Sequence, residues 1–333
     1  HYRDRRQRQM CIRDREYSDL LKRYKSNNLP NSILIHGLSG IGKRTFLNKL
    51  VKNILNIEFK NSNLDHHLNL FKNNTHPNIK IIEKEIEKKT GKIKTNITID
   101  QIRRLKTFLN STSIIQNSSK IVIVDSADYL NISSANSMLK ILEEPKENTY
   151  IFLISNQISL LLPTIRSRCL KIKLNTHNLT NFTNIIKDNI DEISNEEINF
   201  YFELTYGSPG TTILYYNNDF LDIFQLSIKC LLSNDLDDDK INLSNILSKL
   251  TNDEFNNYLS MLKFILIVAN KLKVNRDDKS LVNMPNYIGL ETLSANLTQK
   301  NLIDRFDYLT NNQKELFSLN LDKKIFILNF LTQ

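Results

Sequence analysis

The sequence predicts an α/β domain built on a parallel sheet, followed by a small helical domain and a larger all-helical C-terminal domain. Between Ser32 and Leu174, short apolar runs alternate with segments of helical period, as in a parallel sheet covered by helices on both faces. A glycine-rich loop follows the first apolar run and precedes a helical segment. Beyond Asn175 the strand-like runs fade and helical segments replace them.

Five candidate strands fit the α/β region, because each is a short and largely apolar run of the length that strands have. They are Ser32–His36, Ile79–Ile82, Lys120–Val124, Tyr150–Ile154 and Leu170–Leu174. Two intervening helices have clear start signals. Thr98 and Gln101 form a capping-box pattern, and Asn131 precedes a helix that should stop before Pro145.

The helical half is divided by the run Gly207-Ser208-Pro209-Gly210. The predicted helices here are Phe182–Ile190, Glu196–Thr205, Phe220–Leu232 and Phe255–Leu272. The predicted domains are a leader of residues 1–15, an α/β domain of 16–174, a helical lid of 175–213 and a helical collar of 214–333. We expect Asn56 to Asn74 to be irregular, and Asp235 to Asp239 to be a solvated loop rather than a metal site.

Composition limits the class of protein. A chain of 333 residues with 40% hydrophobic content can build two or three cores. Three widely separated cysteines argue against a disulfide framework or a zinc site, and no apolar run is long enough for a membrane span, so the cytoplasm is the expected location. Residues 1–15 hold six arginines, and we interpret them as a disordered or non-native leader, with a nucleic-acid-binding arm as the alternative.

The glycine-rich loop is Gly37-Leu38-Ser39-Gly40-Ile41-Gly42-Lys43, which fits the pattern G-x-x-x-x-G-K between a strand and a helix. Gly37, Gly40, Gly42 and Lys43 are therefore candidates for binding the phosphates of a nucleotide. Arg44 stands where a Ser or Thr would ligate Mg²⁺, and Thr45 is turned by about 100° around the helix. We therefore predict no metal site, and a degenerate nucleotide site that retains Thr45 among its candidates.

The strand Lys120–Val124 ends in Asp125, the position from which a carboxylate holds the magnesium shell in phosphate-loop enzymes. The next residue is Ser126, which has no carboxylate to orient an attacking water. ATP hydrolysis at this chain's own site is therefore not expected. Asp125 remains a candidate for the nucleotide site, with a strand-end or helix-capping role as the alternative.

Three segments together resemble the clamp-loader family of AAA+ proteins. They are the run Lys120 to Asp128, the run Ser134 to Pro145 that reads SANSMLKILEEP, and the run Leu162 to Cys169 that contains Ser-Arg-Cys. The resemblance covers roughly Leu29 to Leu174, and Gly207 to Gly210 is similar to the family's entry to its last sensor helix. It implies an α/β AAA+ phosphate-loop domain with a parallel sheet, then a helical lid and an all-α oligomerisation domain.

Within that family, an impaired ATP site combined with an intact Ser-Arg-Cys motif resembles the delta-prime type of subunit. The chain departs from many clamp-loader subunits in two ways. It lacks the zinc-binding cysteines between the phosphate loop and Asp125, and Thr211 stands where an active subunit would carry a sensor arginine. Both the second departure and Ser126 agree with a loss of hydrolysis.

The resemblance implies that Arg168 is an arginine finger, which acts in trans on ATP held by a neighbouring subunit. It implies motor (tau/gamma) and delta subunits as partners, with the sliding clamp and primer–template DNA met through the complex. Arg166 could be a structural ion-pair partner, and Asn156 takes the first sensor position. Whether ATP or ADP binds without hydrolysis stays open, and a catalytically active ATPase subunit is the alternative.

Overall fold

The computed structural model describes residues 14–60, 63–87, 91, 93–111, 115, 118–218, 220–233, 235–274, 287–319 and 321–332. The chain forms two compact units. The first runs up to Asn181 and includes Ser208–Gly210, and the second takes Phe182–Gly207 and the residues from Thr211 onward. The division into lid and collar at residue 213 stays a prediction.

The first unit is built on one parallel five-stranded sheet with the strand order β2-β3-β4-β1-β5. Its strands are β1 (Ser32–His36), β2 (Ile79–Ile82), β3 (Lys120–Val124), β4 (Thr149–Ser155) and β5 (Leu170–Lys173). Because β1 lies between β4 and the edge strand β5, the loop after β1 opens at the carboxyl edge of the sheet, next to the ends of these two strands. All five predicted strands are confirmed, with β4 longer by one residue at each end and β5 shorter by one.

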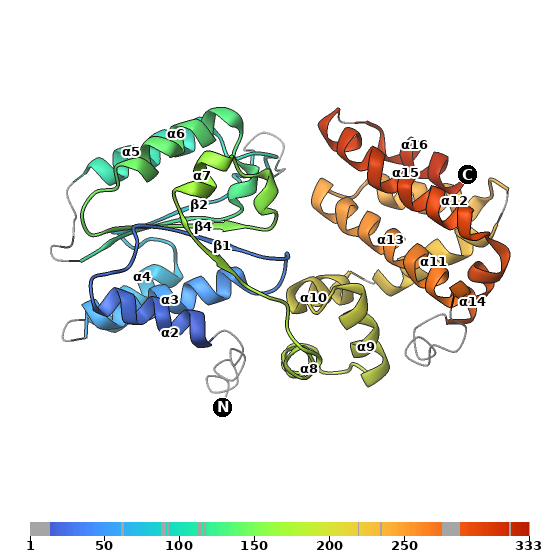
Figure 1. The fold of residues 1–333 in the computed structure, drawn as a ribbon, viewed down its shortest axis with the longest axis horizontal. Coiled ribbons are helices and arrows are strands. Elements are labelled where there is room, and N and C mark those ends of the chain that lie inside the picture. Colours follow the sequence, from blue (N-terminus) through green and yellow to red (C-terminus); the bar gives the residue numbers. More distant parts are fainter. Residues whose placement is uncertain are drawn as a thin grey trace. The chain divides into compact units, whose positions relative to one another are not determined.

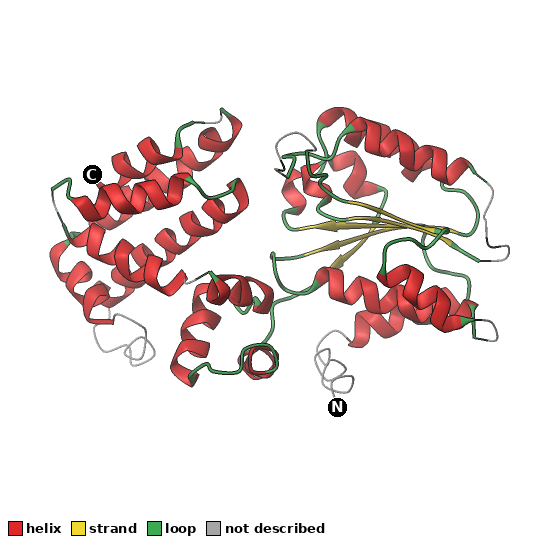
Figure 2. Cartoon of the chain, turned by 180° about the vertical axis from the view of Figure 1, so that it is seen from behind, coloured by secondary structure: helices red, strands yellow, loops and turns green. Residues whose placement is uncertain are grey.

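Helices cover both faces of this sheet (Figure 1 and Figure 2). One layer consists of α2 (Asp14–Lys25), α3 (Lys43–Glu58) and α4 (Leu64–Lys72), and the other of α5 (Ile99–Asn110), α6 (Ile132–Glu143) and α7 (Pro163–Ser167). Alternate strand residues serve the two layers: Ile121 and Ile123 join the core with α3, whereas Val122 and Val124 join the core with α5 and α6. Burial on both faces explains why the strands read as continuous apolar runs.

The start signals of two helices function as predicted. At α5, Thr98 and Gln101 form a reciprocal capping box, and the backbone N–H of Thr98 donates to Gln101 Oε1 at 3.0 Å. At α6, the Asn131 side chain accepts from the backbone N–H of Ser134 at 2.8 Å. Each cap satisfies backbone N–H donors that a helix start would otherwise leave without a partner.

The second unit has only helices among its described secondary-structure elements. Two of its helices begin in the first unit, α8 (Leu179–Lys187) and α10 (Pro209–Asn217). The others are α9 (Asn195–Leu204), α11 (Phe220–Leu232), α12 (Asp238–Ser248), α13 (Asn252–Val274), α14 (Tyr287–Asn296), α15 (Gln299–Ser318) and α16 (Lys323–Leu331). The long α13 packs against α14 and α15, and α12 packs against α11 and α16. Fully buried Phe224 and Tyr258 lie in the core of this unit.

Two local predictions are wrong. Asn56 to Asn74 is not irregular throughout, because α3 continues to Glu58 and α4 follows at Leu64–Lys72. The helix α4 packs on the core of the first unit through the buried Phe71 and the partly buried Leu64 and Leu68. Asp235 to Asp239 is not wholly a loop, because Asp238 and Asp239 are the first residues of α12, which Asp237 caps by accepting from the Lys240 N–H at 2.9 Å.

The predicted leader of residues 1–15 falls mostly outside the described residues. Its last two residues, Asp14 and Arg15, belong to α2. Tyr17 and Leu20 of α2 are buried against the sheet layer that contains α3.

Candidate functional site

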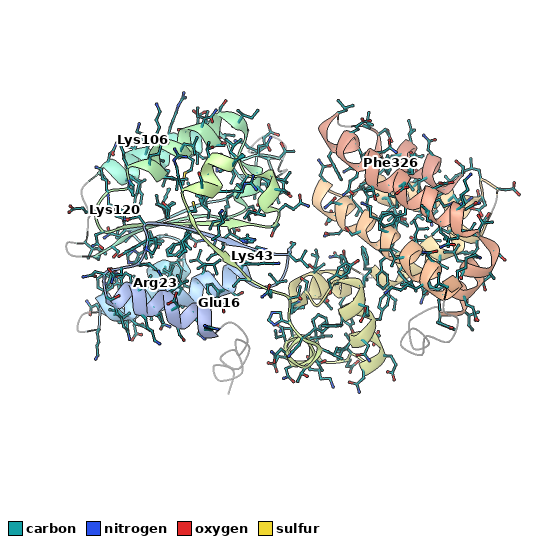
Figure 3. The ribbon with its side chains drawn as sticks, viewed as in Figure 1. Glu16, Arg23, Lys43, Lys106, Lys120 and Phe326 are labelled. Atoms are coloured by element: carbon teal, nitrogen blue, oxygen red, sulfur yellow. The ribbon has the colours of Figure 1, made fainter. Side chains whose placement is uncertain are left out.

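The glycine-rich loop connects β1 to α3 and contains Gly37 and Gly40. Gly42 is the N-cap of α3 and has φ +89°, in the left-handed region that favours glycine. Lys43, labelled in Figure 3, is the first residue of α3 and is buried. This is the strand–loop–helix context that the sequence predicts for a phosphate loop.

The outer side of the loop is held by residues far along the chain. Ser208 Oγ donates to the carbonyl of Ser39 at 2.6 Å, and the Gly210 N–H donates to the carbonyl of Gly40 at 2.8 Å. A Cβ on Gly210 would lie 2.7 Å from the Gly40 carbonyl oxygen, so this approach requires glycine. With these carbonyls bonded outward, the loop is held in one conformation.

Lys43 binds the loop from within. Its Nζ donates to the carbonyls of Gly37 at 2.8 Å and Leu38 at 2.6 Å. The backbone N–H groups of Gly40 and Gly42 find no acceptor among the residues that the structure describes. Backbone N–H groups at the start of a helix, next to a lysine, fit a phosphate group.

The two positions expected to ligate magnesium contact each other instead. Arg44 Nη1 lies 2.9 Å from Asp125 Oδ2 in an ion pair, and Arg44 Nε donates to Asn48 Oδ1 at 3.1 Å. Thr45 is exposed on α3. Magnesium takes oxygen ligands in a strict octahedral arrangement. Because Arg44 offers no oxygen and occupies Asp125, the residues present do not fit Mg²⁺.

The turn after β3 carries a second carboxylate, Asp128, which accepts a hydrogen bond from the backbone and is not part of the Arg44–Asp125 ion pair. Ser126 has φ +59°, in the left-handed region, and Asp128 Oδ1 accepts from the Asn156 backbone N–H at 3.2 Å. The pKa of Asp128 is raised, because burial outweighs the backbone hydrogen bonds and the charge of Lys43, which lower it. Asp128 thus ties the turn after β3 to the end of β4, where Asn156 lies.

A positive field surrounds the end of β1. Burial lowers the pKa of His36, and the charges of Lys173, Lys171 and Lys43 lower it further. A neutral imidazole among three lysines leaves the opening of the loop electropositive. Such a field favours an anion.

Arg168 lies at the carboxyl end of α7, as its C-cap residue. Its Nη2 forms an ion pair with Glu143 Oε1 at 2.6 Å, and its Nη1 donates to the carbonyl of Thr164 at 3.0 Å. The side chain stays 35% exposed. A guanidinium has five N–H donors, so these two bonds leave three for another acceptor.

The residues next to Arg168 differ in their contacts. Ser167 Oγ donates to the carbonyl of Thr164 at 3.0 Å. Cys169 is buried, and burial raises the pKa of its thiol to about 11. For Arg166 the sequence left open a role as a structural ion-pair partner, and its buried Nε has no hydrogen-bond partner among the described residues.

The family described as "DNA polymerase III, delta subunit" matches residues 12–178, which is half of the chain. The chain belongs to this family. Within the match lie the glycine-rich loop, Asp125 and Arg168.

Relatives of this delta-subunit family member are themselves named DNA polymerase III subunit delta-prime. The Pseudomonas aeruginosa protein is 40% identical over 29% of this chain and 27% of its own length. The Haemophilus influenzae protein is 33% identical over 42% of this chain and 41% of its own length. The protein of Buchnera aphidicola subsp. Schizaphis graminum is 26% identical over 79% of this chain and 72% of its own length. The matched part of the chain spans less than half the length of the first two relatives.

Two solved structures resemble this delta-subunit family member. The gamma-subunit-related protein of Thermotoga maritima has a TM-score of 0.43 at 18% identity, and the alignment covers 94% of this chain and 96% of that protein's chain. The clamp loader delta protein of Bacillus subtilis has a TM-score of 0.34 at 12% identity, and the alignment covers 95% of this chain and 100% of that protein's chain. At these TM-scores neither likeness bears on function.

Sequence reasoning did not find three contacts of this family member's site. They are the partner of Arg44, the partner of Arg168, and the attachment of Ser208 and Gly210 to the loop. The sequence contains one hint of the contact between Arg44 and Asp125, which is that the two residues have opposite charges. The spacing of residues along the chain does not indicate the other two contacts.

Among the described residues, no group of three or more His, Cys, Asp or Glu side chains could hold a metal ion. Nor is any described helix both long and apolar enough to cross a membrane.

Proposed function

We propose that this chain is a delta-prime-type subunit of a DNA polymerase III clamp loader that does not hydrolyse ATP itself. In this proposal Arg168 acts in trans on a nucleotide bound by a neighbouring motor subunit. Family membership and the names of the relatives support the subunit type. The finger and the loss of hydrolysis rest on the residues of the site.

The observation that carries the proposal is the position of Arg168. Its guanidinium is partly exposed, is oriented by Glu143 and Thr164, and keeps donors for an acceptor outside the chain. A planar guanidinium with several N–H donors matches the oxygens of a transferring phosphoryl group. Arginine fingers of this kind are worth about 10³ to 10⁵ in rate.

The chain's own loop supports the other half of the proposal. Ser126 offers no carboxylate to orient a water, and the Arg44–Asp125 pair occupies the metal-ligand positions. Gly37, Gly40, Gly42 and Lys43 would hold the phosphates of ATP or ADP, without hydrolysis. A bound nucleotide would supply the negative charge that the electropositive loop opening favours.

The partners follow from the same proposal. They are the motor (tau/gamma) and delta subunits, with the sliding clamp and primer–template DNA met through the assembled complex. The helical residues from 214 onward would supply the oligomerisation surface. The cytoplasm is the compartment in which such a complex would work.

The experiment is ATP turnover by a clamp loader reconstituted from cognate motor and delta subunits, clamp and primed DNA. We expect Arg168→Ala to slow hydrolysis at the neighbouring site by about 10³-fold or more, with the ring still assembled by native mass spectrometry. Arg103→Ala, which removes the exposed ion pair with Asp100, is the matched control and should leave turnover unchanged.

Two results would count against the proposal. Unchanged turnover in the assembled Arg168→Ala ring would reduce Arg168 to a structural residue. ATP turnover by the isolated chain that disappears in Lys43→Ala would instead support the alternative, a catalytically active ATPase subunit.

A further inference from the structure

Arg44 and Asp125 lie 81 positions apart in the sequence, one at the start of α3 and the other at the end of β3. In phosphate-loop enzymes these positions carry the hydroxyl and the carboxylate that hold Mg²⁺ between them. Here the side chains at the two positions bond directly, with 2.9 Å between Arg44 Nη1 and Asp125 Oδ2.

The guanidinium is held at two points, which fixes its plane. Besides the ion pair, Nε donates to Asn48 Oδ1, one turn further along α3. The two side chains are only 29% and 26% exposed, so solvent screens their attraction less than that of a surface pair. The Arg44–Asp125 ion pair is therefore more firmly held than an ion pair on the surface.

We infer that the Arg44 guanidinium replaces the divalent cation at this site, so that the chain excludes Mg²⁺ from its phosphate loop with or without a nucleotide. The inference rests on the proposed function in one respect, which is that the glycine-rich loop binds a nucleotide. A divalent cation at Asp125 would lie beside the guanidinium, and the two positive charges would repel. It would also lack the hydroxyl ligand that Ser or Thr provides.

The replacement changes the charge at the site in a defined way. Arg44 cancels the charge of Asp125 permanently, whereas Mg²⁺ would do so only when bound and would add two positive charges. The carboxylate is therefore neutralised at any concentration of free magnesium. The link between α3 and β3 also persists without a ligand.

The test is binding of Mn²⁺, a paramagnetic probe for the magnesium position, followed by electron paramagnetic resonance on the full chain with and without ADP. We expect no specific Mn²⁺ site in the natural chain. Arg44→Thr restores a hydroxyl and releases Asp125, and should strengthen Mn²⁺ binding with ADP by at least about tenfold, because ligand charge and number tune cation affinity over decades.

Two variants make the test specific. Arg44→Lys keeps a positive charge beside Asp125 and should still exclude Mn²⁺. Arg23→Thr makes the same substitution in the exposed pair of Arg23 with Asp19, and should behave as the natural chain. Circular dichroism checks that each variant is folded.

Two results would overturn the inference. One is a Mn²⁺ site in the natural chain that Asp125→Asn removes, a comparison that does not depend on the folding of Arg44→Thr. The other is a folded Arg44→Thr chain that binds Mn²⁺ no better than the natural chain. Because metal binding is measured on the isolated chain, the outcome is independent of ATP turnover in the reconstituted ring.

Discussion

The guanidinium of Arg168 and the carboxylate of Glu143 lie 2.6 Å apart, and they belong to the ends of two different helices. Glu143 is the last residue of α6, and Arg168 caps the end of α7. The two helices pack against each other in the same layer. The direction of the proposed finger is therefore set by α6, which begins just after the turn that follows β3.

Glu143→Gln should remove the charge that orients Arg168 while keeping the shape of the side chain. The ion pair is half-exposed and worth about 1 kcal/mol at most, so the melting temperature should hardly change. In the reconstituted ring, ATP turnover should fall by up to about fivefold through a less well-oriented finger. Glu144→Gln is the matched control. Equal turnover in the two variants would show that Glu143 does not position Arg168.

Gly210→Ala should destabilise the first unit. The added methyl would lie 2.7 Å from the Gly40 carbonyl oxygen and 3.0 Å from its Cα, so the backbone must shift. Overpacking of this kind costs about 1–3 kcal/mol, which chemical denaturation can measure. The control is Gly91→Asn, since nothing lies within 4 Å of a Cβ there and Asn tolerates its φ of +68°. A Gly210→Ala chain as stable as the natural one would contradict the close contact.

His76 should make stability depend on pH. Burial lowers its pKa to about 4, with smaller contributions from His67 and His66. The unfolded chain takes up this proton near pH 6.5 and the folded chain only near pH 4, so stability falls as the pH drops through this range. The geometry agrees with this direction, because His76 Nδ1 accepts from the Asn78 N–H at 3.2 Å, which a protonated ring cannot do.

The size of this effect is at most about 3 kcal/mol, because each pKa unit corresponds to 1.36 kcal/mol. Urea unfolding at pH 4.5 and at pH 7.5 measures it. His76→Gln should show a smaller loss of stability between these two values than the natural chain. The same loss in both chains would assign the pH dependence to other groups.

The two cysteines that the structure describes should be unreactive in the native state. Burial raises the pKa of Cys169 to about 11 and of Cys230 to about 12. At pH 7.5 fewer than about one such thiol in a thousand is ionised, and only the thiolate is nucleophilic. In a Cys11→Ser background, Ellman's reagent should react slowly with the folded chain and should titrate two thiols in urea. Rapid reaction without urea would contradict the burial of both.

The strands were the most predictable part of this protein. A buried parallel strand consists almost wholly of apolar residues, so β1, β2 and β3 are visible in the sequence with their observed ends. The helix α4 was missed because it has only nine residues and lies between polar segments, although Leu64, Leu68 and Phe71 follow the spacing of a helix. The same weakness of local signal hid the helix cap at Asp237.

The sequence by itself determined the types of most elements and the glycine-rich loop between a strand and a helix, with Arg44 directly after the loop and Ser126 after β3, because these depend on residues close along the chain. Only the tertiary structure decided which side chains meet. The pairs Arg44–Asp125 and Arg168–Glu143, and the bond from Ser208 to the loop, each join distant segments. Their partners follow from the order of the strands and the packing of helices on the sheet, which no local pattern of residues encodes.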